Sequence, residues 1–96
     1  EIEMPFEVKQ IVEKRKEQPF KVTYSDNQYT YIIIGYGRQN HQGYSIKVNN
    51  LYETKNGIYI KTEFQGPKEY SNSENVTYPY IVVKIQQTDK SVIFSE

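Results

Sequence analysis

The chain has 96 residues, which is enough for one domain built around one modest hydrophobic core. Lys and Arg number 12 against 12 Asp and Glu, and this balance argues against a nucleic-acid binder, which needs a basic excess to neutralise phosphates. Cysteine is absent, which excludes disulfides, cysteine-ligated zinc and thiol catalysis.

The residue usage favours strands. The sequence has 10 Tyr and 4 Phe and contains no Ala, while Ile, Val and Thr are plentiful. Aromatic and β-branched residues suit a pleated surface, and a few buried rings supply most of a small core. No apolar run approaches the roughly 20 residues that span a bilayer, so we expect a domain that does not itself cross a membrane. Because the sequence begins at Glu1 rather than at Met, we expect a mature or trimmed fragment.

The first predicted element is a short amphipathic helix over residues 5–17. Val8, Ile11 and Val12 recur at helical spacing, and charged residues cover the remaining faces. Pro5 suits the first turn, and Pro19 ends the helix. The apolar stripe is narrow, so we expect this helix to lie on a sheet.

Two strands follow, because the apolar period changes to 2. Residues 20–25 alternate and predict a strand with one buried face, and Asp26 with Asn27 predicts a tight turn. Residues 29–36 are apolar on both faces, which predicts a strand in the middle of the sheet or sandwich. Residues 37–43 are polar and predict a loop.

The next two strands form a predicted hairpin over residues 44–64. The alternation slips at Asn49 and Asn50, which indicates a β-bulge. Asn56-Gly57 predicts a type I′ turn, whose two central residues need positive φ. A second polar loop covers residues 65–78, and two further strands are expected at 80–87 and 91–94.

These elements predict a mainly β (α+β) fold, a small antiparallel β-sandwich or curled sheet of about six strands with one N-terminal helix. We expect every strand pair to be antiparallel, since the linkers are short for parallel crossovers. One domain would cover residues 1–96, with the helix at 5–17 and the β-domain at 20–94.

Catalytic and metal-binding groups are sparse. His41 is the only histidine, and Ser45, four residues on in a loop-to-strand step, is not expected within its hydrogen-bonding reach. Glu53 and Glu63 could in principle form a glycosidase pair, but both are expected to face solvent on hairpin strands. No cluster matches a zinc or calcium ligand pattern. The sequence therefore predicts a protein that is not an enzyme, with no metal and no cofactor.

The two polar loops are the predicted binding surface, because loops on a rigid β scaffold are the usual carriers of binding function. Their tyrosines could provide rigid contact area, or could instead be core residues with hydroxyl groups at the rim. The predicted protein-binding residues are Arg38, Gln39, Asn40, His41, Gln42, Gly43, Tyr44, Pro67, Tyr70 and Tyr78.

The sequence also resembles a known family. The segments IIIGYGRQNHQGYSIKV (residues 32–48) and GPKEYSNSENVTYPYIVVKI (residues 66–85), with the helix before them, are similar to the PrcB-type domain, the C-terminal domain of a protease complex subunit. Asn40, His41 and Gln42 depart from it, standing where the family commonly has Pro-Thr-Gly. The matching positions are Gly37, Gly43, Tyr44, Ser45, Pro67, Pro79 and Tyr80.

Physical reasons support two of these matches. Gly43 permits a backbone conformation that other residues resist, and Pro79 is a candidate for a cis peptide or the start of an edge strand.

The resemblance implies an exported or lipid-anchored bacterial accessory protein that binds or stabilises a cell-envelope, subtilisin-like protease. An alternative is a chagasin-like protease inhibitor, although this sequence lacks the Pro-Thr-Gly tripeptide and has no Trp. A further alternative is a glycan or small-ligand binder that uses exposed tyrosines. The resemblance does not predict an oligomeric state.

Overall fold

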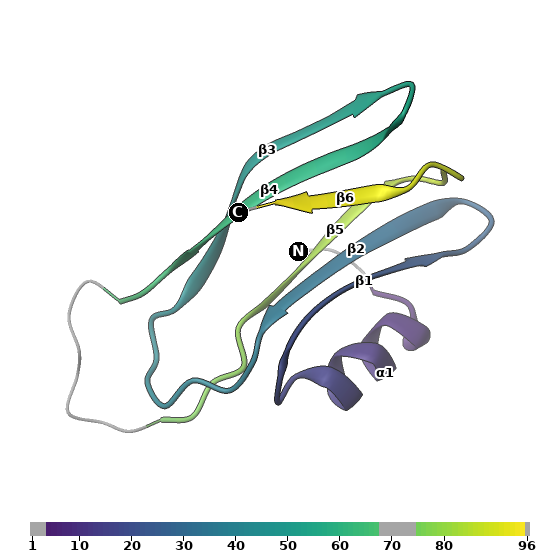
Figure 1. Ribbon diagram of the computed structural model, residues 1–96. Helices are drawn as coiled ribbons and strands as arrows, with labels where there is room; N and C mark the ends of the chain where they lie inside the picture. Colours follow the sequence, from purple (N-terminus) through teal and green to yellow (C-terminus); the bar gives the residue numbers. More distant parts are fainter. Residues whose placement is uncertain (1–3, 68–74, 96) are drawn as a thin grey trace.

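The computed structural model describes residues 4–67 and 75–95, and it confirms a mainly β fold with one helix (Figure 1). Six strands form two three-stranded sheets, and neither sheet closes into a barrel. The elements are α1 (Phe6–Arg15), β1 (Pro19–Ser25), β2 (Tyr29–Tyr36), β3 (Ser45–Thr54), β4 (Gly57–Gln65), β5 (Tyr80–Gln86) and β6 (Val92–Ser95). In the described part of the protein, no helix is long and apolar enough to cross a bilayer.

Helix α1 lies on one sheet, as its narrow stripe predicts (Figure 1). Val8 and Val12 are buried and pack with Phe20 and Ile33 of that sheet. The helix is shorter than the predicted 5–17, because Pro5 is its N-cap in extended conformation and Lys16 is its C-cap. The N–H of Lys16 still donates to the carbonyl of Val12 at 2.9 Å, so the last turn is closed.

The strand order β1-β2-β5 places β2 in the centre of the first sheet, as its two apolar faces predict. Ile33 packs in the cluster beneath the helix. Ile32 and Ile34 face the other way and pack against Ile58 and Ile60 of β4. The molecule is therefore a helix, a sheet and a second sheet in three layers, with β2 buried on both faces.

The expectation that all pairs are antiparallel is wrong for one pair. The second sheet has the order β3-β4-β6, and β4 and β6 run parallel, with Ile58 opposite Val92. Between these two strands the polypeptide passes to the first sheet as β5 and returns to the second sheet as β6, so the crossover that parallel strands need is supplied by a strand of the other layer. Linker lengths between consecutive strands could not reveal this connection.

The hairpin lies where the sequence places it, but the type I′ turn is wrong. Thr54 pairs with Gly57, so Lys55 and Asn56 are the central residues, and no described residue other than Gly37 and Gly43 has positive φ. The N–H of Asn56 donates to Oγ1 of Thr54 at 3.1 Å, which stabilises a different turn. The predicted bulge is confirmed by the register shift between Val48 and Asn50.

Of the two roles predicted for Pro79, the structure supports the start of an edge strand. The described residues contain no cis peptide bond, so the cis alternative is wrong. Pro79 directly precedes β5, which lies at the edge of its sheet. This position accommodates a residue without an N–H donor.

Candidate functional site

Three connecting segments gather at one end of the two sheets (Figure 1). They are residues 37–44 between β2 and β3, residues 66–67 after β4, and residues 75–79 before β5. Residues 38–44 together with Pro67, Thr77 and Tyr78 are called the loop surface below.

The loop between β2 and β3 is fastened to the segment before β5. Gln39 and Thr77 exchange two main-chain hydrogen bonds of 2.8 Å. The side-chain amide of Gln39 donates to the carbonyl of Tyr36 at 3.1 Å, and the hydroxyl of Thr77 donates to the carbonyl of His41 at 2.9 Å. These bonds satisfy the loop backbone from inside the domain, so the loop has a defined conformation rather than many alternatives.

Gly43 confirms its predicted conformational role. Its φ is +91°, a value that residues with a side chain rarely adopt, and a Cβ there would lie 2.7 Å from Cβ of Pro67. Gly37 has φ +79° and lies against Pro19. The N–H of Arg38 then donates to the carbonyl of Glu17 at 3.3 Å, which ties the loop to the end of the helix segment.

Three aromatic rings support the loop from below. Phe64 of β4 stacks on Tyr36 of β2, with ring centroids 4.3 Å apart and planes at 11°. Phe64 also stacks on Tyr44, with ring centroids 5.1 Å apart and planes at 4°. Tyr36 and Tyr44 are only half-buried, so they act as the rim of the core, which favours the structural alternative for these tyrosines over free presentation to a partner.

The loop residues predicted from the sequence divide into two groups. Those with exposed side chains or exposed backbone are Arg38, Asn40, Gln42 and Gly43. Those that are half-buried and support the loop are Gln39, His41, Tyr44, Pro67 and Tyr78. Tyr70 lies outside the described residues. Lys16 Nζ lies 4.7 Å from the centre of the Tyr78 ring, which links the loop surface to the helix.

The residues considered for catalysis make other contacts. The hydroxyl of Ser45 donates to the side-chain carbonyl of Gln65 at 3.5 Å, and the carbonyl of His41 accepts from Thr77. The amides of Asn49 and then Gln65 hold the pKa of Glu63 below its usual range, the opposite of what a general acid needs.

Glu53, the other carboxylate of the considered pair, forms an ion pair with Lys90 on the surface. Within residues 4–67 and 75–95, no group of three His, Asp or Glu is placed to hold a metal ion.

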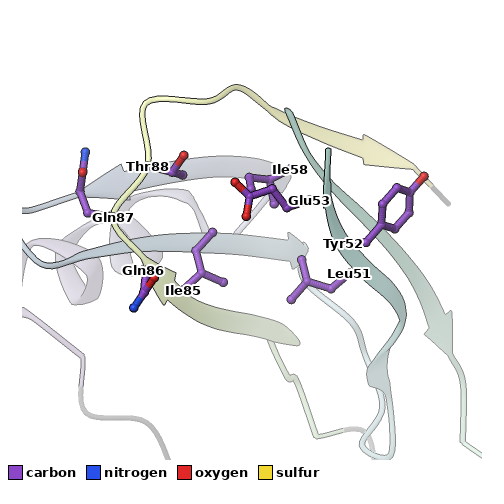
Figure 2. Close-up of a pocket in the computed structure, with 8 residues that line it drawn as sticks. All are labelled: Leu51, Tyr52, Glu53, Ile58, Ile85, Gln86, Gln87 and Thr88. Carbon is purple, nitrogen blue, oxygen red and sulfur yellow. The ribbon is translucent and has the colours of Figure 1, made fainter. Parts of the chain in front are cut away.

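Sequence reasoning missed a cavity at the opposite end of the sheets (Figure 2). It encloses about 450 Å³, and Leu51 and Ile85 point toward one another across it while Tyr52 points away. The lining residues are Leu51, Tyr52, Glu53, Ile58, Ile85, Gln86, Gln87 and Thr88. The available signal in the sequence was Leu51 and Tyr52, two large side chains that directly follow the polar pair Asn49-Asn50.

Thr77 and Val76 lie in the predicted binding loop 65–78, but sequence reasoning did not single them out as site residues. Thr77 fastens the loop, and Val76 lines a second cavity beside Arg38. No local pattern marks either residue, because both act through contacts with a segment distant in the sequence.

Comparison with known proteins identifies the family of this domain. The model of the family described as PrcB C-terminal matches residues 30–86, more than half of the sequence, from β2 to β5. The chain belongs to the PrcB C-terminal family. This is not a known catalytic family, and membership in it suggests a protease-associated accessory domain. Every described residue of the loop surface falls inside the matched region of this PrcB C-terminal domain.

An uncharacterized protein of Methanocaldococcus jannaschii is 36% identical over 73 residues. The aligned part covers 76% of this protein and 44% of that relative, so the PrcB C-terminal domain spans less than half the length of the relative. No solved structure matches significantly.

Proposed function

We propose that this PrcB C-terminal domain is a non-catalytic interaction module that binds another exported protein through the loop surface. The observation that carries the proposal is the pair of 2.8 Å main-chain bonds between Gln39 and Thr77, which fixes a polar, exposed loop tip on a β scaffold. A loop that is already ordered loses less conformational entropy when it binds. Arg38, Asn40 and Gln42 are the exposed side chains that this tip offers.

The proposed partner is a subtilisin-like protease of the cell envelope, with the domain on an exported or lipid-anchored protein. Family membership supports a protease-associated role. Recovery of the native protein only in the cytosolic fraction of its host would contradict the exported site of action.

Binding to purified subtilisin tests the surface and the partner class together. The triple variant R38Q/N40A/Q42A removes the exposed tip, and we expect its affinity to fall at least about tenfold, since few interface residues carry most of the binding energy. The matched control K55Q/N50A/Q86A makes the same kinds of change at exposed positions that lie outside the loop surface. Biolayer interferometry compares the two variants with the unaltered domain.

The outcomes separate the two parts of the proposal. Equal affinity for both triple variants would show that the loop surface is not the interface. No binding by the unaltered domain at about 10 μM would reject subtilisin-like proteases as the partner class.

A protease inhibitor is a second candidate, because a fastened loop at one end of a β scaffold is also what insertion into an active-site cleft requires. The hydrolysis of a peptide substrate by subtilisin and by papain, with and without the domain, distinguishes inhibition from binding alone. Unchanged hydrolysis at saturating domain would dismiss the inhibitor.

The glycan alternative draws on exposed Tyr52 and Tyr80, which are 51% and 42% exposed. The Tyr52 ring already stacks on Tyr59, with centroids 5.2 Å apart, so part of its face is covered. Tyrosine fluorescence that does not respond to cell-wall glycans would count against this alternative.

A further inference from the structure

A small polar cavity lies between the loop surface and Val76. It encloses about 410 Å³ and is lined by Arg38, Asn40, His41 and Val76. Three of these four residues carry nitrogen donors in their side chains, and Val76, which is 40% exposed, provides an apolar wall. The cavity therefore combines one positive charge, an amide donor and a hydrophobic contact.

Arg38 supplies the charge. A guanidinium is always protonated and presents a planar fork of donors that matches a carboxylate. The ion pairs formed among the described residues are those of Lys16 with Glu13 and of Lys90 with Glu53, so no described carboxylate pairs with Arg38. Its main-chain N–H is bonded to the carbonyl of Glu17, which fixes where the side chain begins.

The other walls of the cavity are also held in place. The carbonyl of His41 accepts a 2.9 Å bond from Thr77, and Val76 directly precedes Thr77 in the sequence. The Gln39–Thr77 bridge therefore holds both sides of the cavity at a fixed separation. A site of this kind exists before a ligand arrives and needs little rearrangement.

We propose that this cavity binds a carboxylate of the partner protein. Arg38 donates to both carboxylate oxygens, the side-chain amide of Asn40 donates to one of them, and Val76 contacts the aliphatic carbons that carry the group. The inference rests on the proposed function, and it names the chemistry that the loop surface recognises. The carboxylate belongs either to an acidic side chain or to the C-terminal residue of a polypeptide, and both offer the same two oxygens.

An isolated carboxylate binds such a half-open site weakly, because water screens an exposed ion pair. Within a larger interface the same contact selects one partner over another, since an uncharged or basic group in the cavity leaves Arg38 desolvated without an acceptor. The cavity is therefore a determinant of specificity.

Nuclear magnetic resonance titration of the 15N-labelled domain tests the site without a partner protein. N-acetylglutamate α-amide presents a side-chain carboxylate and N-acetylalanine a terminal one, and their neutral amide counterparts serve as ligand controls. We expect saturable shifts confined to residues 38–41 and 76–77 with at least one of the two acids. R38Q should abolish these shifts, and R15Q, which removes the same charge from an exposed helix position, should leave them unchanged.

A response to only one acid assigns the source of the carboxylate. The inference is overturned if neither acid produces saturable shifts at about 50 mM, a concentration suited to weak ion pairs, or if R38Q responds like the unaltered domain. Equal shifts with sulfate at matched ionic strength would also overturn it, because the site would then accept any anion.

The subtilisin measurement separates this inference from the proposed function. If R38Q/N40A/Q42A loses binding while R38Q alone retains it, the result supports the loop surface as the interface and contradicts the carboxylate site. If the acids bind at Arg38 while the triple variant retains subtilisin binding, the cavity binds carboxylates but does not lie in the interface with subtilisin, and the proposed interface is wrong.

Discussion

The rings of Tyr36 and Phe64 join the two sheets at the end that carries the loop surface. Their centroids are 4.3 Å apart and their planes are inclined by 11°, with Tyr36 on β2 and Phe64 on β4. The hydroxyl of Tyr36 also shares a 3.5 Å hydrogen bond with the hydroxyl of Thr62. The loop is thus built on a contact between layers rather than on one sheet alone.

Removing the central ring should destabilise the domain. The substitution F64A deletes the stacking with both Tyr36 and Tyr44, and we expect the free energy of unfolding to fall by about 2 kcal/mol, less than for a fully buried Phe. Urea denaturation measures the change. The control F6A deletes a ring that is 69% exposed and should alter the value by no more than about 0.5 kcal/mol. Equal losses in the two variants would contradict a structural role for the stack.

Gly43 should not tolerate a side chain. An alanine there would keep φ near +91° with its Cβ 2.7 Å from Cβ of Pro67, so we expect G43A to lower the free energy of unfolding by about 2 kcal/mol. At Gly66 the nearest atom, Cε1 of Tyr44, would lie 3.6 Å from a new Cβ. The control G66A should therefore remain within about 0.5 kcal/mol of the unaltered domain. Thermal or urea unfolding of both variants measures these changes. A G43A variant as stable as the unaltered domain would count against a strained backbone at Gly43.

Local patterns predicted those parts of the fold that depend on burying one face. Alternation over residues 20–25 and the apolar run over 29–36 became β1 and β2, because each pattern reports how many faces of a strand are covered. The bulge at Asn49 and Asn50 was predictable for the same reason, since an extra residue reverses the phase of alternation.

Contacts between distant segments were beyond the reach of those patterns. The parallel pairing of β4 with β6 depends on where β5 lies, and the division of the loop into a tip and its supports depends on Thr77. The type I′ turn predicted from Asn56-Gly57 was wrong for a related reason. Glycine at position 57 is required by the close approach of β6 rather than by a positive φ, and local turn statistics do not contain that neighbour.

Gly57 therefore provides a test of the parallel pair. A Cβ at this position would lie 2.5 Å from Cδ1 of Ile93 and 2.9 Å from the carbonyl oxygen of Ser91. We expect G57A to push β6 outward, with a loss of about 2 kcal/mol and faster hydrogen exchange at the N–H of Ile58, which donates to Ser91 at 2.9 Å.

The double variant G57A/I93V removes the Cδ1 atom and should recover part of the loss relative to G57A. The carbonyl of Ser91 remains in the way, so recovery should be incomplete. Additive losses in the double variant would indicate that Ile93 does not lie over Gly57.

Asp26 should make stability depend on pH at the acid end. The N–H groups of Gln28 and then Tyr29 donate to its carboxylate at 2.8 and 2.7 Å and hold its pKa below the usual value. A pKa lower in the folded than in the unfolded state stabilises the fold above the unfolded value, about 3.9, and this contribution is lost as pH falls through the folded value. D26N should thus be less stable than the unaltered domain at pH 7, with a smaller difference at pH 2.

The titration can be followed directly through the side-chain carbonyl resonance of Asp26. D89N is the matched control, because Asp89 accepts a bond from the side chain of Gln87 rather than from the turn backbone. A midpoint for Asp26 at or above the unfolded value would refute the turn contribution.

The hydroxyl of Thr77 should determine how firmly the loop tip is held. T77V removes its 2.9 Å bond to the carbonyl of His41 and leaves both main-chain bonds to Gln39 in place. We expect a loss of about 1 kcal/mol in unfolding free energy, the typical net value of one hydrogen bond. Hydrogen exchange should become faster within residues 39–43, while the exposed Thr23 of β1 provides the control T23V.

The T77V variant also separates the effect of loop order on binding from the effect of the exposed loop side chains. T77V keeps the exposed Arg38, Asn40 and Gln42, so a binding defect would come from the entropy of ordering a looser loop. We expect weaker binding to subtilisin, caused mainly by a slower association because fewer loops are in the bound conformation at any time. An unchanged affinity together with faster exchange would mean that the partner tolerates a mobile tip, and that the bond to His41 serves stability alone.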